Sequence, residues 1–234
     1  MSTTGLPGDE TPRSIALVTG ASRGLGFAVA RALGATGWQV VALARTVGGL
    51  EELADAVVTA GGPNPTLVPL SLTDDGGMQR LCLAIHERWG RLDLVVHCAA
   101  YASPLAPADH VAPKDWTQAV EVNLAATGRL LVMTAPLLRA SPRGGTFVFC
   151  ADSRGGQPLF GSYGATKAGA EALVRSWAAE SERLGPRVMT FHPNPMPTAL
   201  RARFYPGENR DSLTPTETEA ERLLAILEAE ATTA

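Results

Sequence analysis

Short apolar runs alternate with longer segments of helical period along this chain, and the alternation constrains its fold more than any single motif. The runs are rich in Val, Leu and Phe, as expected of strands buried on both faces of a parallel sheet. The runs predicted as strands are 14–19, 38–44, 66–70, 92–98, 146–150 and 187–192. The segments predicted as helices are 24–35, 50–60, 74–89, 116–139, 162–184 and 217–229. This order predicts an α/β domain with a doubly wound parallel sheet of about six strands and helices on both faces.

Length, charge and cysteine usage narrow the class of protein. The 234 residues are 45% hydrophobic, which is enough for one sizeable core. The formal net charge of -3 argues against a nucleic-acid partner, and no apolar run is long enough for a membrane helix. Cys82, Cys98 and Cys150 are widely spaced, which suits free thiols in a reducing compartment. We expect a cytoplasmic protein with a disordered tail at 1–12 and a single domain at 13–234.

A glycine-rich loop follows the first predicted strand and leads into a predicted helix. Glycines permit a tight turn, and a helix N-terminus directs unpaired N–H groups at an anion. A glycine triplet alone is weak evidence, but this position is that of a Rossmann-type dinucleotide site. We predict that the loop Thr19-Gly20-Ala21-Ser22-Arg23-Gly24-Leu25-Gly26 binds the cofactor through Gly20, Ser22, Arg23, Gly24, Leu25 and Gly26.

The residues at the end of the second predicted strand indicate whether NAD or NADP(H) binds. They are Ala44-Arg45-Thr46, without the carboxylate that accepts both ribose hydroxyls of NAD. Arg45 and Arg23 could together hold the 2′-phosphate of NADP(H), a contact that guanidinium groups make well. The alternative is that both are solvated surface residues. The missing carboxylate and the two cations favour NADP(H).

A tyrosine and a lysine four positions apart begin the helix predicted at 162–184. In Tyr163-Gly164-Ala165-Thr166-Lys167 the two side chains share one helical face, so the ammonium can lie beside the phenol. A nearby cation would lower the pKa of a tyrosine from about 10 and suit it to proton transfer. Such a pair alone is usually a surface pair, but together with the glycine loop it indicates a catalytic site.

These motifs resemble the short-chain dehydrogenase/reductase family, from Ser14 to about Thr198. The resemblance implies that Tyr163 exchanges a proton with the substrate oxygen and that Lys167 binds the nicotinamide ribose and lowers the pKa of Tyr163. It also implies that Asn123 positions a water beside the lysine. Further cofactor contacts implied by the resemblance are Ala99, Pro193, Met196 and Thr198. The segments 149–163 and 196–207 look closest to an uncharacterised bacterial branch of the family.

The chain departs from the family at the catalytic serine. An ungapped alignment of the fifth predicted strand places Asp152 at that position and Ser153 one residue later. Adjacent strand residues point to opposite faces, so Ser153 reaches the site only if the strand bulges or turns early. An ionised Asp152 facing the site would raise the pKa of Tyr163 and repel a developing alkoxide. We predict Ser153 as the substrate hydrogen-bond donor, with Asp152 as the alternative.

Two further segments depart from the family pattern. His97-Cys98-Ala99-Ala100 stands where the family has Asn-Asn-Ala-Gly, and Asn194 replaces a glycine. An asparagine tolerates left-handed backbone angles better than most residues. His97 beside Cys98 has no cluster of partner ligands, so no metal site is predicted.

The two longest predicted helices indicate how chains of this protein assemble. The helix predicted at 217–229 is followed by few residues, so we do not expect the seventh strand that is usual in the family. The helices at 116–139 and 162–184 are rich in Ala and Gly, and in the family such helices pack against their symmetry mates. We expect a homodimer through these helices. The alternative is that they pack only on their own sheet.

Two functions from different classes remain. The first is an NADPH-preferring oxidoreductase that acts on the CH–OH group and interconverts a small carbonyl and an alcohol, with Tyr163, Lys167, Asn123 and Ser153 as its machinery. The second is a catalytically impaired member that binds NADP(H) and acts as a sensor or scaffold. The presence of Tyr163, Lys167 and Asn123 together favours the enzyme.

Overall fold

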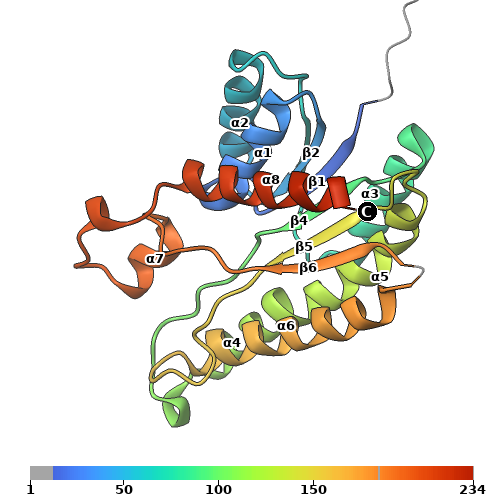
Figure 1. Cartoon of the computed structure of the whole chain (residues 1–234). Helices are drawn as coiled ribbons and strands as arrows, with labels where there is room; N and C mark the ends of the chain where they lie inside the picture. The colour runs from blue at the N-terminus through green and yellow to red at the C-terminus, as the bar shows by residue number, and fades with distance from the viewer. Residues whose placement is uncertain (1–12, 184, 234) are drawn as a thin grey trace, which may run out of the picture.

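Six parallel strands form one sheet in the order β3-β2-β1-β4-β5-β6 (Figure 1). They are seen in a computed structural model that describes residues 13–183 and 185–233. The tail predicted at 1–12 lies outside the described residues. The strands are β1 (Ile15–Thr19), β2 (Gln39–Ala44), β3 (Thr66–Pro69), β4 (Leu94–His97), β5 (Thr146–Cys150) and β6 (Arg187–Phe191). Each lies within a predicted run, so the predicted doubly wound sheet is confirmed.

Helices follow the strands as predicted, with two differences. They are α1 (Gly24–Ala35), α2 (Val47–Thr59), α3 (Asp75–Trp89), α4 (Pro113–Ala119), α5 (Ala126–Arg139), α6 (Gly161–Ser181), α7 (Ala199–Phe204) and α8 (Thr216–Thr233). The single helix predicted at 116–139 is wrong in detail, because a π-helical segment at Val120–Ala125 separates α4 from α5. The second difference is α7, which forms inside a segment predicted as a loop. No helix among the described residues is long and apolar enough to cross a membrane.

The two faces of the sheet bury alternate residues of the central strands β1, β2, β4 and β5. On β1, Ala16 and Val18 pack in a cluster with α1, α2 and α8, whereas Ile15 and Leu17 pack in a second cluster with α3, α5 and α6. Figure 1 shows α8 crossing the sheet on the side of α1, with α5 and α6 on the opposite side. Burial on both faces explains why these central strands are largely apolar rather than alternating.

A buried carboxylate joins the segment after β6 to α8. Glu219 is 1% exposed, and it accepts hydrogen bonds from the backbone N of Asn194 at 3.0 Å and its Nδ2 at 2.7 Å. Arg222 donates to the same carboxylate at 2.7 Å. Asn194 therefore fixes this segment by hydrogen bonds, and Leu159 is the only non-glycine residue with positive φ in the described chain. The expectation that Asn194 serves for its left-handed angles is thus wrong.

Replacing Glu219 with alanine should lower the free energy of unfolding by about 1–3 kcal/mol, because Asn194 and Arg222 lose the buried carboxylate to which they donate. Burial raises the pKa of Glu219, but the hydrogen bonds from Arg222 and Asn194 outweigh it and leave the pKa lowered. The stabilisation is therefore full above the pKa of the unfolded chain, about 4.3, and is lost as the pH falls through the folded value. Urea unfolding at several pH values measures this, with Glu221→Ala on the exposed side of α8 as the control. An equal loss in both variants would contradict the assignment.

Candidate active site

A cavity of about 420 Å³ runs along the carboxyl ends of the strands. This is the edge at which ligands bind in doubly wound sheets. The cavity lining includes every residue predicted to bind the cofactor: Gly20, Ser22, Arg23, Gly24, Leu25, Gly26, Arg45, Ala99, Tyr163, Lys167, Pro193, Met196 and Thr198. Asn123 and Ser153 are not part of the lining.

The glycine loop is shaped by close backbone contacts. A Cβ atom at Gly26 would lie 2.4 Å from the carbonyl oxygen of Gly20, a distance that no side chain tolerates. The loop therefore packs directly against the first turn of α1, whose N–H groups open toward the cavity. Arg23 and Arg45 are exposed at this end of the cavity, and no ion pair to a described residue occupies them.

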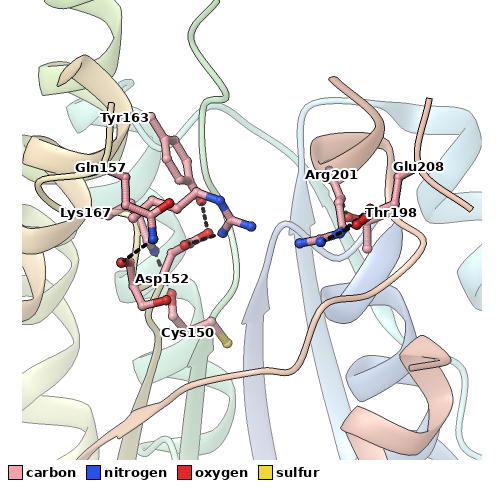
Figure 2. A network of polar contacts seen from close by, with 10 residues as sticks. Cys150, Asp152, Gln157, Tyr163, Lys167, Thr198, Arg201 and Glu208 are labelled. Carbon is pink, nitrogen blue, oxygen red and sulfur yellow. Dashed lines mark hydrogen bonds and ion pairs between the residues drawn. The ribbon is translucent and has the colours of Figure 1, made fainter. Parts of the chain in front are cut away.

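Tyr163 is held by Asp152 rather than by a serine. The Tyr163 hydroxyl donates to Asp152 Oδ2 at 2.9 Å, and the other carboxylate oxygen is ion-paired with Arg154 (Figure 2). The Asp152 side chain is 13% exposed and lines the cavity. A carboxylate, a guanidinium and a phenol thus form one network at the end of β5.

The pKa of Tyr163 is raised well above its usual value of 10. Burial is the main cause, followed by the charge of Asp152 and its hydrogen bond. The expectation that Lys167 lowers this pKa is therefore wrong for this structure. At neutral pH the hydroxyl keeps its proton, which suits donation to a carbonyl oxygen better than abstraction from an alcohol.

Lys167 lies on the next turn of α6 below Tyr163. Its Nζ donates to the backbone carbonyl of Cys150 at 2.6 Å and lies 4.1 Å from the ring centroid of Phe149. Burial lowers the pKa of Lys167, and nearby Cys150 and Asp152 act against this. The ammonium is thereby fixed at the cavity wall, close to the Tyr163–Asp152 pair (Figure 2).

Comparison with known proteins now decides the family. Residues 14–209 match the short chain dehydrogenase family. The chain belongs to the short-chain dehydrogenase/reductase family.

Members of this family resemble the chain over most of its length. The uncharacterized oxidoreductase YciK of Escherichia coli K12 is 32% identical over 204 residues, which are 85% of this chain and 80% of that protein. A short chain dehydrogenase from Pseudomonas syringae has a TM-score of 0.84 and 34% identity, covering 88% of this chain and 85% of the other. A third, from Escherichia coli CFT073 and complexed with NADPH, has a TM-score of 0.82 and 31% identity, covering 87% and 85%.

The placement predicted for the family's catalytic serine is wrong. Ser153 is exposed, and among the described residues its backbone carbonyl, not its hydroxyl, has a hydrogen-bond partner, Gln157 Nε2 at 3.4 Å. Ala151 N donates to Phe191 O at 2.8 Å and extends the pairing one residue beyond Cys150, and the chain turns from Ser153 onward. In this arrangement Asp152 lines the cavity, whereas Ser153 is exposed.

Close packing against α6 fixes the segment that carries these residues. A Cβ atom at Gly164 would lie 2.5 Å from the carbonyl oxygen of Arg154. Because Gly164 directly follows Tyr163, this contact sets the distance between the Asp152–Arg154 pair and the hydroxyl. No pattern in the sequence singled out Arg154, whose guanidinium also lies 5.4 Å from the ring centroid of Phe160.

Asn123 holds a neighbouring loop rather than lining the cavity. In the π-helical segment it is 1% exposed, accepts from Tyr101 N at 2.7 Å and donates to Tyr101 O at 3.0 Å. It also donates to Thr166 Oγ1 of α6 at 3.1 Å. Asn123 therefore joins the segment after β4, which lines the cavity, to the helix that carries Tyr163 and Lys167.

Thr198 lines the cavity and also begins α7. Its Oγ1 accepts from Arg201 N at 3.2 Å, and Arg201 pairs with Glu208 at 2.5 Å (Figure 2). Arg203 on the same helix lines the cavity and was not predicted. A short helix thus covers the end of the cavity near Tyr163.

His97 is a neutral structural residue. Its ring nitrogens lie 2.7 Å from Thr19 Oγ1 and 3.0 Å from Thr127 Oγ1. Burial, and then the charge of Lys167, lowers its pKa to about 3. Within the described chain, no group of three or more His, Cys, Asp or Glu residues could hold a metal.

Proposed function

We propose that this protein is an NADP(H)-dependent oxidoreductase that transfers a hydride between the nicotinamide and a small carbonyl or alcohol substrate. The observation that carries the proposal is one cavity lined by the glycine loop, two arginines and the Tyr163–Lys167 pair. The NADPH in the similar Escherichia coli CFT073 structure supports the same cofactor. Incubation with NADPH and a panel of ketones and aldehydes, followed by cofactor absorbance, tests it.

The residues present fit this cofactor, which would supply the hydride. The N–H groups of the glycine loop and α1 would bind the pyrophosphate, with Arg23 and Arg45 at the 2′-phosphate. Lys167 would bind the nicotinamide ribose, and Thr198 the carboxamide. Tyr163 would then give its proton to the substrate oxygen. Before it does so, its hydrogen bond to Asp152 must break.

NADPH should bind at least about tenfold more tightly than NADH, because a charge-assisted contact to a phosphate is worth about 1.5–3 kcal/mol. Replacing Arg45 with Asp should abolish or reverse this preference. Titration followed by nicotinamide fluorescence measures both affinities, and Arg31→Asp on the exposed side of α1 is the control. Equal affinities of the unaltered protein for NADPH and NADH would contradict the two-arginine site.

A second function is favoured by the Tyr163–Asp152 hydrogen bond. A hydroxyl with a raised pKa that donates to a carboxylate is held away from a substrate oxygen. A protein in this state could bind NADP(H) and serve as a sensor or scaffold without turnover. NADPH binding without oxidation of NADPH across the carbonyl panel would establish this function instead.

We also propose that two chains assemble through α5 and α6. Val132 on α5 is 75% exposed and Leu173 on α6 is 40% exposed. Both are large apolar side chains beside small residues: a Cβ atom at Gly128 would lie 3.4 Å from Leu173. Two such faces could pack closely about a two-fold axis.

Light scattering should give a mass near twice 24.5 kDa. Val132→Glu should shift the mass to that of one chain, because a charge would be buried between the two faces. Leu83→Glu, at an exposed apolar position of α3, should leave the assembly intact. A monomeric unaltered protein, or a dimer that survives Val132→Glu, would place the contact elsewhere or exclude it.

A further inference from the structure

Two cysteines lie side by side in the wall of the cavity. The Sγ atoms of Cys98 and Cys150 are 3.3 Å apart, both residues line the cavity, and both are free thiols. The sheet register places them there, because His97, the last residue of β4, pairs with Phe149 of β5 and each of the two is followed by a cysteine. Neighbouring strands are about 4.8 Å apart, within the Cα–Cα range of a disulfide. A bond could therefore form without a large movement of the backbone.

We propose that Cys98 and Cys150 are an oxidisable dithiol, which a peroxide converts to a disulfide that weakens NADP(H) binding. The effect on NADP(H) rests on the proposed function, whereas formation of the disulfide does not. No other pair of the three cysteines has this arrangement, since Cys82 lies on α3 outside the cavity.

The chemistry balances with hydrogen peroxide as the oxidant. Cys98 is half-buried and Cys150 is buried, so we assign the first step to the Cys98 sulfur. It attacks one peroxide oxygen, the O–O bond breaks, and a sulfenic acid and one water form. The Cys150 sulfur then attacks the Cys98 sulfur, the S–O bond breaks, and a second water leaves. Each sulfur loses one electron, and the peroxide takes both electrons and the two thiol protons.

The surroundings of the Cys98 thiol determine how fast it reacts with a peroxide. The pKa of Cys98 is raised, mainly by its hydrogen bond with Cys150 and also by burial, while the charge of Lys167 acts in the opposite direction. The thiolate is the nucleophile, and a raised pKa keeps the thiolate fraction small. Cys98 therefore reacts slowly with a peroxide. A nucleotide that fills the cavity would also shield both sulfurs.

The disulfide would change the cavity because both cysteines carry parts of it. The carbonyl of Cys150 binds Lys167 Nζ at 2.6 Å, so a shift of Cys150 moves the ammonium. Cys98 precedes Ala99, whose Cα lies 2.9 Å from the position that a Cβ on Gly20 would take. Drawing the sulfurs together therefore disturbs the lysine on one side and the glycine loop on the other.

The test uses Cys82→Ser, which leaves only the dithiol and alters no cavity residue. After hydrogen peroxide, the thiol count under denaturing conditions should fall from two to none, and the mass of the intact chain should fall by about 2 Da, with no disulfide-linked pair of chains. The Kd for NADPH should rise at least about tenfold and return after dithiothreitol. Bound NADPH should slow the loss of thiols.

Cys82→Ser/Cys150→Ser is the matched control, in which a disulfide within the chain cannot form. Two thiols surviving in Cys82→Ser, or a disulfide that leaves the Kd unchanged, would overturn the proposal. A reduced protein that binds no NADPH would refute the proposed function and the effect on affinity. The thiol count and the mass would still decide whether the dithiol is oxidised.

Discussion

Replacing Tyr163 with phenylalanine should lower turnover by about 100-fold or more while the Kd for NADPH stays within about twofold. The variant keeps the ring, whose centroid lies 4.9 Å from that of Phe204, and removes only the hydroxyl. In the proposed mechanism, that hydroxyl gives a proton to the substrate oxygen. Cofactor absorbance measures turnover, and fluorescence titration measures the Kd.

Lys167→Ala should differ from Tyr163→Phe, because the Lys167 ammonium would bind the nicotinamide ribose and also lies beside Tyr163. Its removal should weaken NADPH binding as well as turnover, and it should also free the Cys150 carbonyl. If Tyr163→Phe keeps its turnover within about threefold of the unaltered protein, the proton comes from another group and the proposed mechanism is wrong.

The sheet was predictable because its physical signal is local. Burial on both faces makes each central strand an apolar run, so Thr146–Cys150 was predicted with the bounds that the structure has. The glycine loop fixed the start of α1 in the same way, and Gly24–Ala35 also agrees. By contrast, α7 has only six residues, too few to show helical periodicity, and its signal was Thr198 as the N-cap.

The chemistry at the end of β5 was not predictable, because it depends on contacts between distant segments. Whether Asp152 or Ser153 enters the cavity depends on the pairing of Ala151 with Phe191 of β6. The pKa of Tyr163 depends on the orientation of Asp152, which Arg154 and the packing at Gly164 set. The sequence shows that either Asp152 or Ser153 could face the cavity, and only the tertiary structure shows that it is Asp152.

Replacing Asp152 with serine should raise the turnover of carbonyl reduction by on the order of 100-fold. An ionised carboxylate cannot donate a hydrogen bond to a developing oxyanion, and its charge repels that oxyanion. A serine at the same position removes the charge and adds a donor, and one such donor is worth about 100-fold to 1,000-fold in turnover. The change also releases the Tyr163 hydroxyl from its present acceptor.

The pH profile separates this explanation from a merely structural effect. Burial, the charge of Asp152 and its hydrogen bond raise the pKa of Tyr163, so the hydroxyl stays protonated to high pH in the unaltered protein. Asp152→Ser and Asp152→Asn remove the charge, so the alkaline loss of reduction should move to lower pH in both variants.

Ser153→Ala provides the matched control for these variants. Ser153 is exposed and does not line the cavity, so removal of its hydroxyl should leave turnover and the pH profile unchanged. A fall in turnover of tenfold or more in Asp152→Ser and Asp152→Asn alike would mean that the carboxylate itself takes part in proton transfer. The Tyr163–Asp152 pair, rather than Tyr163 alone, would then be the acid–base group of this enzyme.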